Sequence, residues 1–359
     1  MSKKQAAGLV APFLILRPVR MTRIERLHAT GIRRLGSPKR GFRYVTADGK
    51  DGKRPSAADL DRIDRLVLPP AWRDVAISAS PSAALQAIGR DAAGRWQYRY
   101  SEEHERRREH KKGERLVEFA GALPRMRAAI ERDLAHPELD REKVMACILR
   151  ILSTCFLRPG SEVYAAENGS YGIATLRNRH VTVKGDLIRY DFPGKSGKRQ
   201  HLEFRDRRVA SIIRQLKRMP GKELFKYRDA EGKVVDVKRR HINQYIKEVM
   251  GERFTAKDFR TWAGTLLCAC ALARAGADPS ESRTARKKKA VVAIRNTATI
   301  LGNTPAVCRK SYIASSVLDS FERGRTIEHN FETVEQLVAR RRGLHAAERD
   351  VLRLLKQIA

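Results

Sequence analysis

Residues 301–312 read Leu-Gly-Asn-Thr-Pro-Ala-Val-Cys-Arg-Lys-Ser-Tyr, and this segment is the most informative part of the chain. Its Thr-Pro step predicts the start of a helix, because threonine is a good N-cap and proline fits the first helical position. We expect the helix to cover residues 305–322 and to bury a stripe made of Val307, Ala314, Leu318 and Phe321. Tyr312 lies about 140° around the axis from Val307. It therefore points away from the core of its own helix, and a surface tyrosine is the simplest interpretation of that position alone.

Positive charge gathers around this tyrosine in the sequence. Arg309 and Lys310 stand close to it, and residues 283–295 contain six Lys or Arg and no acid. A phenol, with an ordinary pKa of about 10, becomes a usable nucleophile only where cations stabilise its phenolate. The surplus of cations makes Tyr312 a candidate nucleophile.

The composition indicates a polyanionic partner. The chain has 359 residues with 74 Lys and Arg against 41 Asp and Glu, a formal net charge of +33, and 42% hydrophobic residues. That apolar content is enough for a core, so the chain is not a disordered basic tail. A surplus of this size destabilises the folded state, because the positive side chains repel one another. It therefore favours a nucleic acid or an anionic membrane as the partner.

The membrane alternative has little support in the sequence. No run of about 18 apolar residues occurs, and the longest early run, residues 6–16, is interrupted by Gly8 and Pro12 and has no cleavage signal. We therefore expect a cytoplasmic protein and favour a nucleic acid as the partner.

Metal and nucleotide chemistry also lack the usual signals. The five cysteines form no CxxC pair and lie in apolar helical segments, so we expect small core residues in a reducing compartment. Asp59, Asp61 and Asp64 are more typical of a solvated helix than of a metal site. The chain contains no GxxxxGK[ST], GxGxxG or HExxH motif. The sequence therefore predicts no metal, no nucleotide and no other cofactor.

The pattern of apolar, turn-forming and charged residues predicts an α+β protein with a small β-rich N-terminal domain and a larger, mainly α domain. The expected parts are a basic, poorly ordered arm over 1–40, a β-rich domain over 41–101, a charged connector over 102–115, a mainly helical domain over 116–325 and a C-terminal helical tail over 326–359.

The larger domain should contain a buried helix over 142–157 and then a three-stranded meander. Its strands are expected at 181–183, 187–192 and 200–204, and a last helix at 334–358. Further helices are expected at 209–217, 240–250, 257–274 and 285–301.

Five motifs in order resemble the type IB DNA topoisomerases of the bacterial and poxvirus branch. About two thirds of the chain is matched, from Leu68 to Tyr312. The motifs are Leu68-Pro69-Pro70-Ala71-Trp72 with the strand at 94–100, Leu157-Arg158-Pro159-Gly160, Gly194-Lys195-Ser196-Gly197-Lys198, Lys257-Asp258-Phe259-Arg260-Thr261-Trp262, and Gly302-Asn303-Thr304-Pro305 with a tyrosine nine residues after the asparagine.

The resemblance implies that residues 41–101 bind DNA, that residues 116–325 form the catalytic domain and that the protein is associated with the nucleoid. It also implies a role for each matching residue. Tyr312 would attack a backbone phosphorus and form a 3′-phosphotyrosyl bond, with a free 5′-hydroxyl, and the reverse reaction would reseal the strand without ATP. Arg158 and Arg260 would bind the non-bridging oxygens, since planar guanidinium groups suit that task. Lys195 would protonate the departing 5′ oxygen. Considered singly, Arg158 could be a cation at a helix end and Arg260 a solvated residue.

Position 303 departs from the commoner pattern of the family, which has histidine there. Asn303 can donate a hydrogen bond to a phosphoryl oxygen but cannot transfer a proton. His180 is a conceivable substitute, although we prefer a DNA-contacting or structural role for it.

The expected DNA-binding residues lie in three places: the strand at 96–100 and the segment at 175–180, which the resemblance covers, and the acid-free stretch at 283–295. On the strand at 96–100, Gln97 should face one side and the two tyrosines the other, where they touch DNA or pack under the sheet. The full set is Gln97, Tyr98, Tyr100, Arg177, Arg179, His180, Lys287, Lys288 and Lys289.

These observations predict a monomer that surrounds duplex DNA and relaxes supercoils by transient nicking of one strand. A tyrosine recombinase is the nearest alternative, because its catalytic domain uses a similar residue set. The β-rich segment before the connector argues against it. A basic DNA-binding protein without catalysis would have to lack one of the proposed catalytic side chains, and none is missing.

Overall fold

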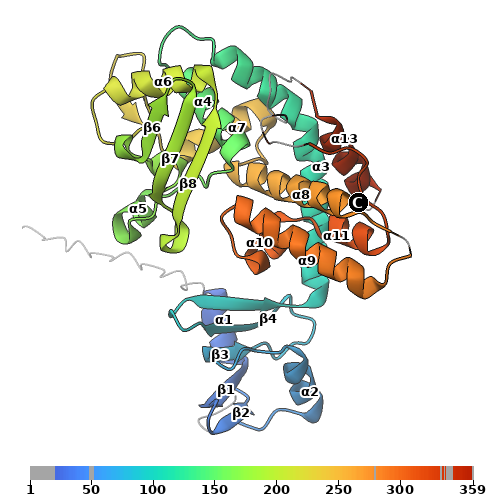
Figure 1. The fold of residues 1–359 in the computed structure, drawn as a ribbon. Coiled ribbons are helices and arrows are strands. Elements are labelled where there is room, and N and C mark those ends of the chain that lie inside the picture. The colour runs from blue at the N-terminus through green and yellow to red at the C-terminus, as the bar shows by residue number, and fades with distance from the viewer. Residues whose placement is uncertain are drawn as a thin grey trace, which may run out of the picture. The chain divides into compact units, whose positions relative to one another are not determined.

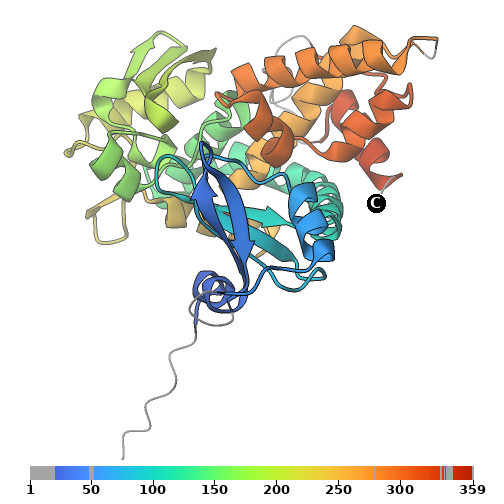
Figure 2. The same cartoon turned by 90° about the horizontal axis from the view of Figure 1, so that it is seen from below.

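The computed structural model describes residues 21–47, 52–278, 280–331, 334, 336 and 343–357. The chain divides into two compact units, residues 1–108 and 109–359. Figures 1 and 2 show the elements of each unit in two views. Of the helices in the described part, none combines the length and apolar character that a bilayer-spanning helix requires.

The first unit is built on a five-stranded antiparallel sheet with the order β2-β1-β3-β4-β5. Ile63 of α2 is buried with Ile32, Val75, Ile77 and Ala87 of the strands. The elements are α1 (Arg23–Thr30), β1 (Ile32–Ser37), β2 (Gly41–Val45), α2 (Ala57–Arg65), β3 (Arg73–Ile77), β4 (Leu85–Arg90) and β5 (Trp96–Tyr100).

The N-terminal segment differs from the expected disordered arm. Residues 1–20 lie outside the described part, but α1 and β1 occupy much of residues 21–40. Helix α1 begins with a capping box, in which the Thr22 hydroxyl accepts from the backbone N–H of Glu25 and the Glu25 carboxylate accepts from that of Thr22. Ile32 is buried in the sheet, so the prediction of an arm up to residue 40 is wrong for this stretch.

The predicted connector is the beginning of a long helix, α3 (Glu102–Asp133). The division between the two units falls inside α3, after Arg108. Apolar side chains first become buried at Leu116 and then continue along one side of α3. The polar start of α3 and its apolar remainder therefore belong to one continuous element.

The second unit is mainly helical and contains the predicted meander, with strand order β6-β7-β8. Figure 1 shows the meander and α6 on one side of this unit and α8 to α11 on the other. The elements after α3 are α4 (Arg141–Cys155), α5 (Glu162–Asn168), β6 (Val181–Lys184), β7 (Leu187–Pro193), β8 (Arg199–Arg205), α6 (Arg207–Arg218), β9 (Lys226–Arg228), β10 (Val234–Asp236), α7 (Arg239–Met250), α8 (Ala256–Ala275), α9 (Arg283–Ile300), α10 (Pro305–Tyr312), α11 (Ser315–Glu322) and α13 (Ala346–Lys356).

The helix expected over residues 305–322 is two helices. Helix α10 ends at Tyr312, Ile313 and Ala314 have extended backbone angles, and α11 follows. Of the predicted stripe, Ala314, Leu318 and Phe321 are buried as expected, whereas Val307 is 47% exposed, so the prediction of burial is wrong for Val307. The break places Tyr312 in the last turn of a short helix.

The last helix, predicted over 334–358, is not continuous, because residues 343–345 are not helical; residues 335 and 337–342 lie outside the described part. Helix α13 begins after His345, whose backbone N–H and side chain form a capping box with Glu348. Glu348 is buried, and its carboxylate binds the Arg127 guanidinium at 2.8 and 2.9 Å and the Trp262 indole N–H at 3.2 Å. These bonds attach α13 to α3 and α8.

Candidate active site

Tyr312 lies at the C-terminal end of α10, whose start agrees with the sequence prediction. The Thr304 hydroxyl accepts from the Val307 N–H at 3.3 Å, and Pro305 occupies the first turn. The tyrosine side chain is half-buried and packs against the core of the unit. Its aromatic ring lies 4.9 Å from the guanidinium carbon of Arg260.

Arg260 is buried in α8, with 2% of its surface exposed. Its guanidinium donates to the carbonyl of Phe156 and, at 2.9 Å, to the carbonyl of Leu301. Burial lowers the pKa of this guanidinium, and the neighbouring Tyr312 hydroxyl acts in the opposite direction. Two carbonyls from separate segments thus fix a planar cation against the tyrosine ring.

Arg158 follows the end of α4, where Phe156 adopts a left-handed conformation at φ 51°. Its Nη2 atom donates to the Gly302 carbonyl at 2.9 Å and to Oδ1 of Asn303. Burial, and secondly the charge of Arg260, lower the pKa of Arg158. The two guanidinium groups are therefore close enough to influence one another.

The side chain of Asn303 is oriented by Arg158. Because arginine can only donate, the amide oxygen faces the guanidinium and the amide nitrogen is directed elsewhere. That nitrogen is buried and has no hydrogen-bond partner among the described residues. The Asn303 backbone is held by its N–H, which donates to the Ala298 carbonyl at 2.8 Å. The loop therefore presents a fixed amide with a free donor.

A small depression lies beside this group, lined by Arg158 and Arg260 and by residues of the β7–β8 hairpin, Gly194 and Gln200. Gln200 lies against Gly302, where an added Cβ would come within 2.8 Å of its amide oxygen. Lys195 is exposed at the turn of the same hairpin. In the described part of the chain, it makes no hydrogen bond or ion pair with the other four predicted catalytic residues.

The thiol of Cys308 is another possible nucleophile and lies one turn before Tyr312 in the sequence. Cys308 is fully buried, and burial raises the pKa of its thiol to about 11. A thiol in that state is unreactive. All five cysteines are free, and four of them are buried, as expected for core residues.

In the N-terminal unit, the faces of β5 are as predicted. The rings of Tyr98 and Tyr100 stack with centroids 6.4 Å apart, and Tyr98 is 42% exposed. Gln97 donates through its amide nitrogen to the Asp91 carboxylate at 2.8 Å. Tyr100 also stacks on His104 at 4.9 Å, so it is more enclosed than Tyr98.

The segment at 177–180 favours the structural role for His180. The His180 side chain is 5% exposed and accepts from the Arg177 N–H at 3.1 Å. Burial and the neighbouring arginine charges lower its pKa to about 4. Arg179 is exposed, whereas Arg177 is half-buried and lies over the ring of Tyr171 at 5.3 Å.

The three lysines predicted on α9 are not equivalent. Lys287 and Lys288 are exposed. Lys289 instead donates to the Glu281 carboxylate and, at 3.1 Å, to the Gly276 carbonyl. Its ammonium therefore belongs to the segment that joins α8 and α9.

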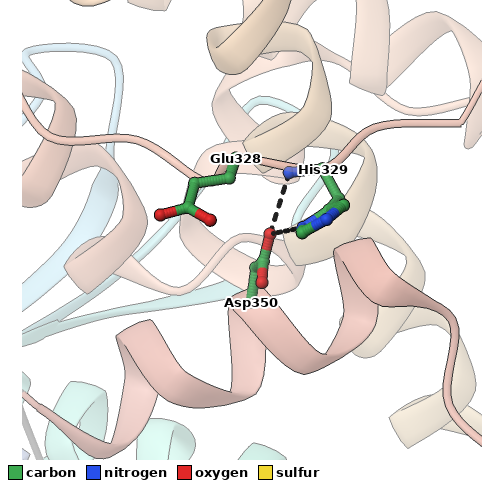
Figure 3. A group of neighbouring side chains, drawn as sticks. All are labelled: Glu328, His329 and Asp350. Atoms are coloured by element: carbon green, nitrogen blue, oxygen red, sulfur yellow. Dashed lines mark hydrogen bonds and ion pairs between the residues drawn. The ribbon is translucent and has the colours of Figure 1, made fainter.

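One group in the described residues brings three potential metal-ligating side chains within 4.8 Å of each other: Glu328, His329 and Asp350. Figure 3 shows Asp350 facing both the backbone nitrogen and the ring of His329, at 2.8 and 2.9 Å. These contacts provide hydrogen-bond partners for the buried Asp350 carboxylate, and they join the segment after α11 to α13.

Thr265 is a site residue that the sequence did not reveal. It is fully buried in α8, and its hydroxyl donates to the Tyr312 carbonyl at 3.3 Å and accepts from the Ala314 N–H at 3.1 Å. Gly264 beside it allows the close approach, since a Cβ there would lie 2.5 Å from the Tyr312 carbonyl oxygen. The end of α10 is thus fixed to α8.

Comparisons with known proteins point to related families for both units of the chain. Residues 101–337 match the family described as eukaryotic DNA topoisomerase I, catalytic core, and residues 41–91 match the bacterial DNA topoisomerase IB N-terminal domain. The chain is 34% identical over 322 residues to DNA topoisomerase 1B of Acanthamoeba polyphaga mimivirus, covering 88% of this chain and 95% of that protein. It is 25% identical over 235 residues to DNA topoisomerase I of Monkeypox virus and to DNA topoisomerase 1B of Vaccinia virus (strain Copenhagen), covering 65% of this chain and 71% of each.

Proposed function

Because the chain belongs to the type IB DNA topoisomerase family, we propose that it relaxes supercoiled duplex DNA by cutting and resealing one strand through Tyr312. The observation that supports this most strongly is the packing of the Arg260 guanidinium 4.9 Å from the centre of the Tyr312 ring, with Arg158 and Asn303 beside it.

In the cleavage step, the Tyr312 oxygen forms a bond to a backbone phosphorus, and the bond from phosphorus to the 5′ oxygen breaks. The products are a 3′-phosphotyrosyl linkage and a 5′-hydroxyl. Attack by that hydroxyl regenerates the phosphodiester and the phenol. Each step exchanges one phosphoester for another, so the proposed cycle consumes no ATP.

Arg158 and Arg260 are proposed to bind the non-bridging oxygens, where negative charge increases in the transition state. Both guanidinium groups are already anchored by backbone carbonyls, so they need little rearrangement when the phosphate arrives. Their positive charge also favours the phenolate that the attack requires. The Asn303 amide nitrogen would donate a further, uncharged hydrogen bond.

Lys195 is proposed as the general acid that protonates the 5′ oxygen as it leaves. Gly194 and Gln200, which flank the turn that carries Lys195, line the depression beside Arg158. Because the turn is exposed, the Lys195 ammonium is able to reach a bound strand. Catalytic groups often reach their final geometry only in the complex with substrate.

Each unit supplies its own proposed DNA contacts. In the β-rich domain, proposed as residues 41–101, these are Gln97, Tyr98 and Tyr100. In the catalytic domain, proposed as residues 116–325 and of the tyrosine recombinase kind, Arg179, Lys287 and Lys288 are the better-placed cations. Lys289 is paired with Glu281, and Arg177 is half-buried against Tyr171 and lies 4.0 Å from the Glu223 carboxylate. We propose a monomer acting on DNA in the cytoplasm.

Incubation with supercoiled plasmid in EDTA, without ATP, tests the function. Relaxed topoisomers are the expected product, and the Tyr312→Phe variant should leave the plasmid supercoiled. Plasmid that stays supercoiled at every salt concentration would contradict the proposal. Binding without relaxation would indicate a non-catalytic protein, and strand exchange between two specific sites would indicate a recombinase.

A further inference from the structure

The backbone that follows the nucleophile is held by a lysine from a distant part of the chain. The Lys112 ammonium, on α3, donates to the Ile313 carbonyl at 2.8 Å and to the Lys310 carbonyl at 3.3 Å. It also binds the Glu109 carboxylate one turn earlier on α3, at 2.8 Å. These three acceptors match the three N–H donors of an ammonium group.

Helix geometry explains why a cation fits there. The last carbonyls of a helix have no partner within the helix and carry its negative dipole end. Helix α10 ends at Tyr312, and Lys112 binds one carbonyl of its last turn and the carbonyl directly after it. Lys112 therefore caps the nucleophile's helix from a second helix, with only 16% of its side chain exposed.

The position of Lys112 within α3 gives this cap a second property. The first residues of α3, up to Arg108, belong to the N-terminal unit, and the rest of the helix belongs to the second unit. Lys112 lies four residues after that division. It thus joins the end of the nucleophile's helix to the helix that connects the units.

We propose that Lys112 is a positioning residue for Tyr312, which sets the geometry of the nucleophile by holding the Lys310 and Ile313 carbonyls. This proposal rests on the function proposed above. Thr265 fixes the same turn from α8, and Lys112 fixes it from α3, so the tyrosine is held between two helices. Small displacements of a reacting group can reduce a rate by about 10²-fold.

The matched control is the neighbouring Lys111, which is exposed on the same turn of α3. K111A removes the same charge as K112A, so both should weaken DNA binding similarly if charge alone matters. K112R keeps a cation that can donate to both carbonyls, and it should restore most of the activity that K112A loses.

The experiment is single-turnover cleavage of a suicide duplex at saturating protein, with affinity measured separately. The expected result is a cleavage rate constant about tenfold or more lower for K112A, near the parent value for K111A, and largely recovered in K112R. With protein in saturating excess over DNA, a partial loss of folded protein leaves the cleavage rate constant unchanged, so the rate constant reports positioning.

Equal cleavage rate constants for K112A and K111A would overturn the proposal, as would a K112A defect confined to affinity. A parent protein that forms no covalent product would instead refute the proposed function. The two failures are therefore distinguishable in one set of reactions.

Discussion

The Arg158 guanidinium donates a hydrogen bond to the Asn303 amide oxygen, and this bond leaves the Asn303 amide nitrogen without a partner among the described residues. A buried, unpaired donor is costly, and such groups often have a functional explanation. Here a phosphoryl oxygen is the acceptor that we propose.

Asn303→Ala should lower the single-turnover cleavage rate by about 10², by analogy with the removal of one oxyanion donor. Asn303→His should remain within about tenfold of the parent, because an imidazole N–H can also donate to the oxygen. Rates would be measured on one DNA substrate at saturating protein.

Asn303→Asp separates the two hydrogen bonds of this side chain, the one accepted from Arg158 and the one proposed to be donated to a phosphoryl oxygen. The carboxylate can still accept from Arg158 but offers no donor and adds a negative charge, so its cleavage rate should be at least as low as that of Asn303→Ala. If Asn303→Ala cleaves as fast as the parent, Asn303 serves only to shape its loop.

Thr265→Val should reduce the free energy of unfolding by about 1–3 kcal/mol, because the buried Ala314 N–H loses its acceptor. Thr265→Ser keeps the hydroxyl and is the control; its loss should be smaller. Denaturant unfolding followed by circular dichroism provides the measurement. Equal stability of the Val variant and the parent would show that the hydroxyl does not hold the turn.

Lys195→Ala should slow cleavage of ordinary DNA by about 10² to 10⁴, the usual contribution of a general acid. It should slow cleavage far less when sulfur replaces the 5′ bridging oxygen, since a thiolate leaves without a proton. The comparison uses rate constants for the two substrates with the same variant. Similar slowing on both would assign Lys195 to phosphate binding alone.

The formal charge of +33 predicts that DNA affinity depends steeply on salt. If roughly six to ten phosphates are neutralised, affinity should fall by about 10³ to 10⁵ between about 50 and 200 mM salt. The measurement is the slope of log affinity against log salt. A nearly flat plot would mean that the surplus charge does not face DNA.

The lysines of α9 refine this prediction. Replacing both Lys287 and Lys288 with alanine should make the slope shallower by up to about 1.8, at about 0.9 for each phosphate that the protein no longer neutralises. Lys289→Ala should change it less, because its ammonium is paired with Glu281. An equal change for Lys289 would contradict the different roles assigned to these lysines.

The elements that were predicted correctly are those with clear signals within a few residues of sequence. The meander strands were predicted to within two residues, because alternating side chains and glycine turns define them. The start of the helix at Pro305 was predicted from another local signal, the Thr-Pro step. The start of α1 was missed, although Thr22 and Glu25 form a recognisable capping box.

The contacts that shape the site depend on residues far apart in the sequence. The break after Tyr312 was missed because Thr265 and Lys112, which hold it, are 47 and more residues away and have no local signal. The pairing of Lys289 and the burial of His180 likewise arise from tertiary packing. Resemblance to a family selected the catalytic set, and the structure adds how its members are held.

Covalent attachment of DNA to Tyr312 is the most direct test of the account. A suicide duplex, from which the short fragment bearing the new 5′-hydroxyl diffuses after cleavage, would be incubated with the parent protein and with Tyr312→Phe, and the adduct digested and mapped by mass spectrometry. The parent should carry the DNA on Tyr312 through its 3′ end, and the Phe variant should form no adduct while its duplex affinity stays within a few-fold of the parent. An adduct on the Phe variant, or a parent adduct mapped to another residue, would contradict the account.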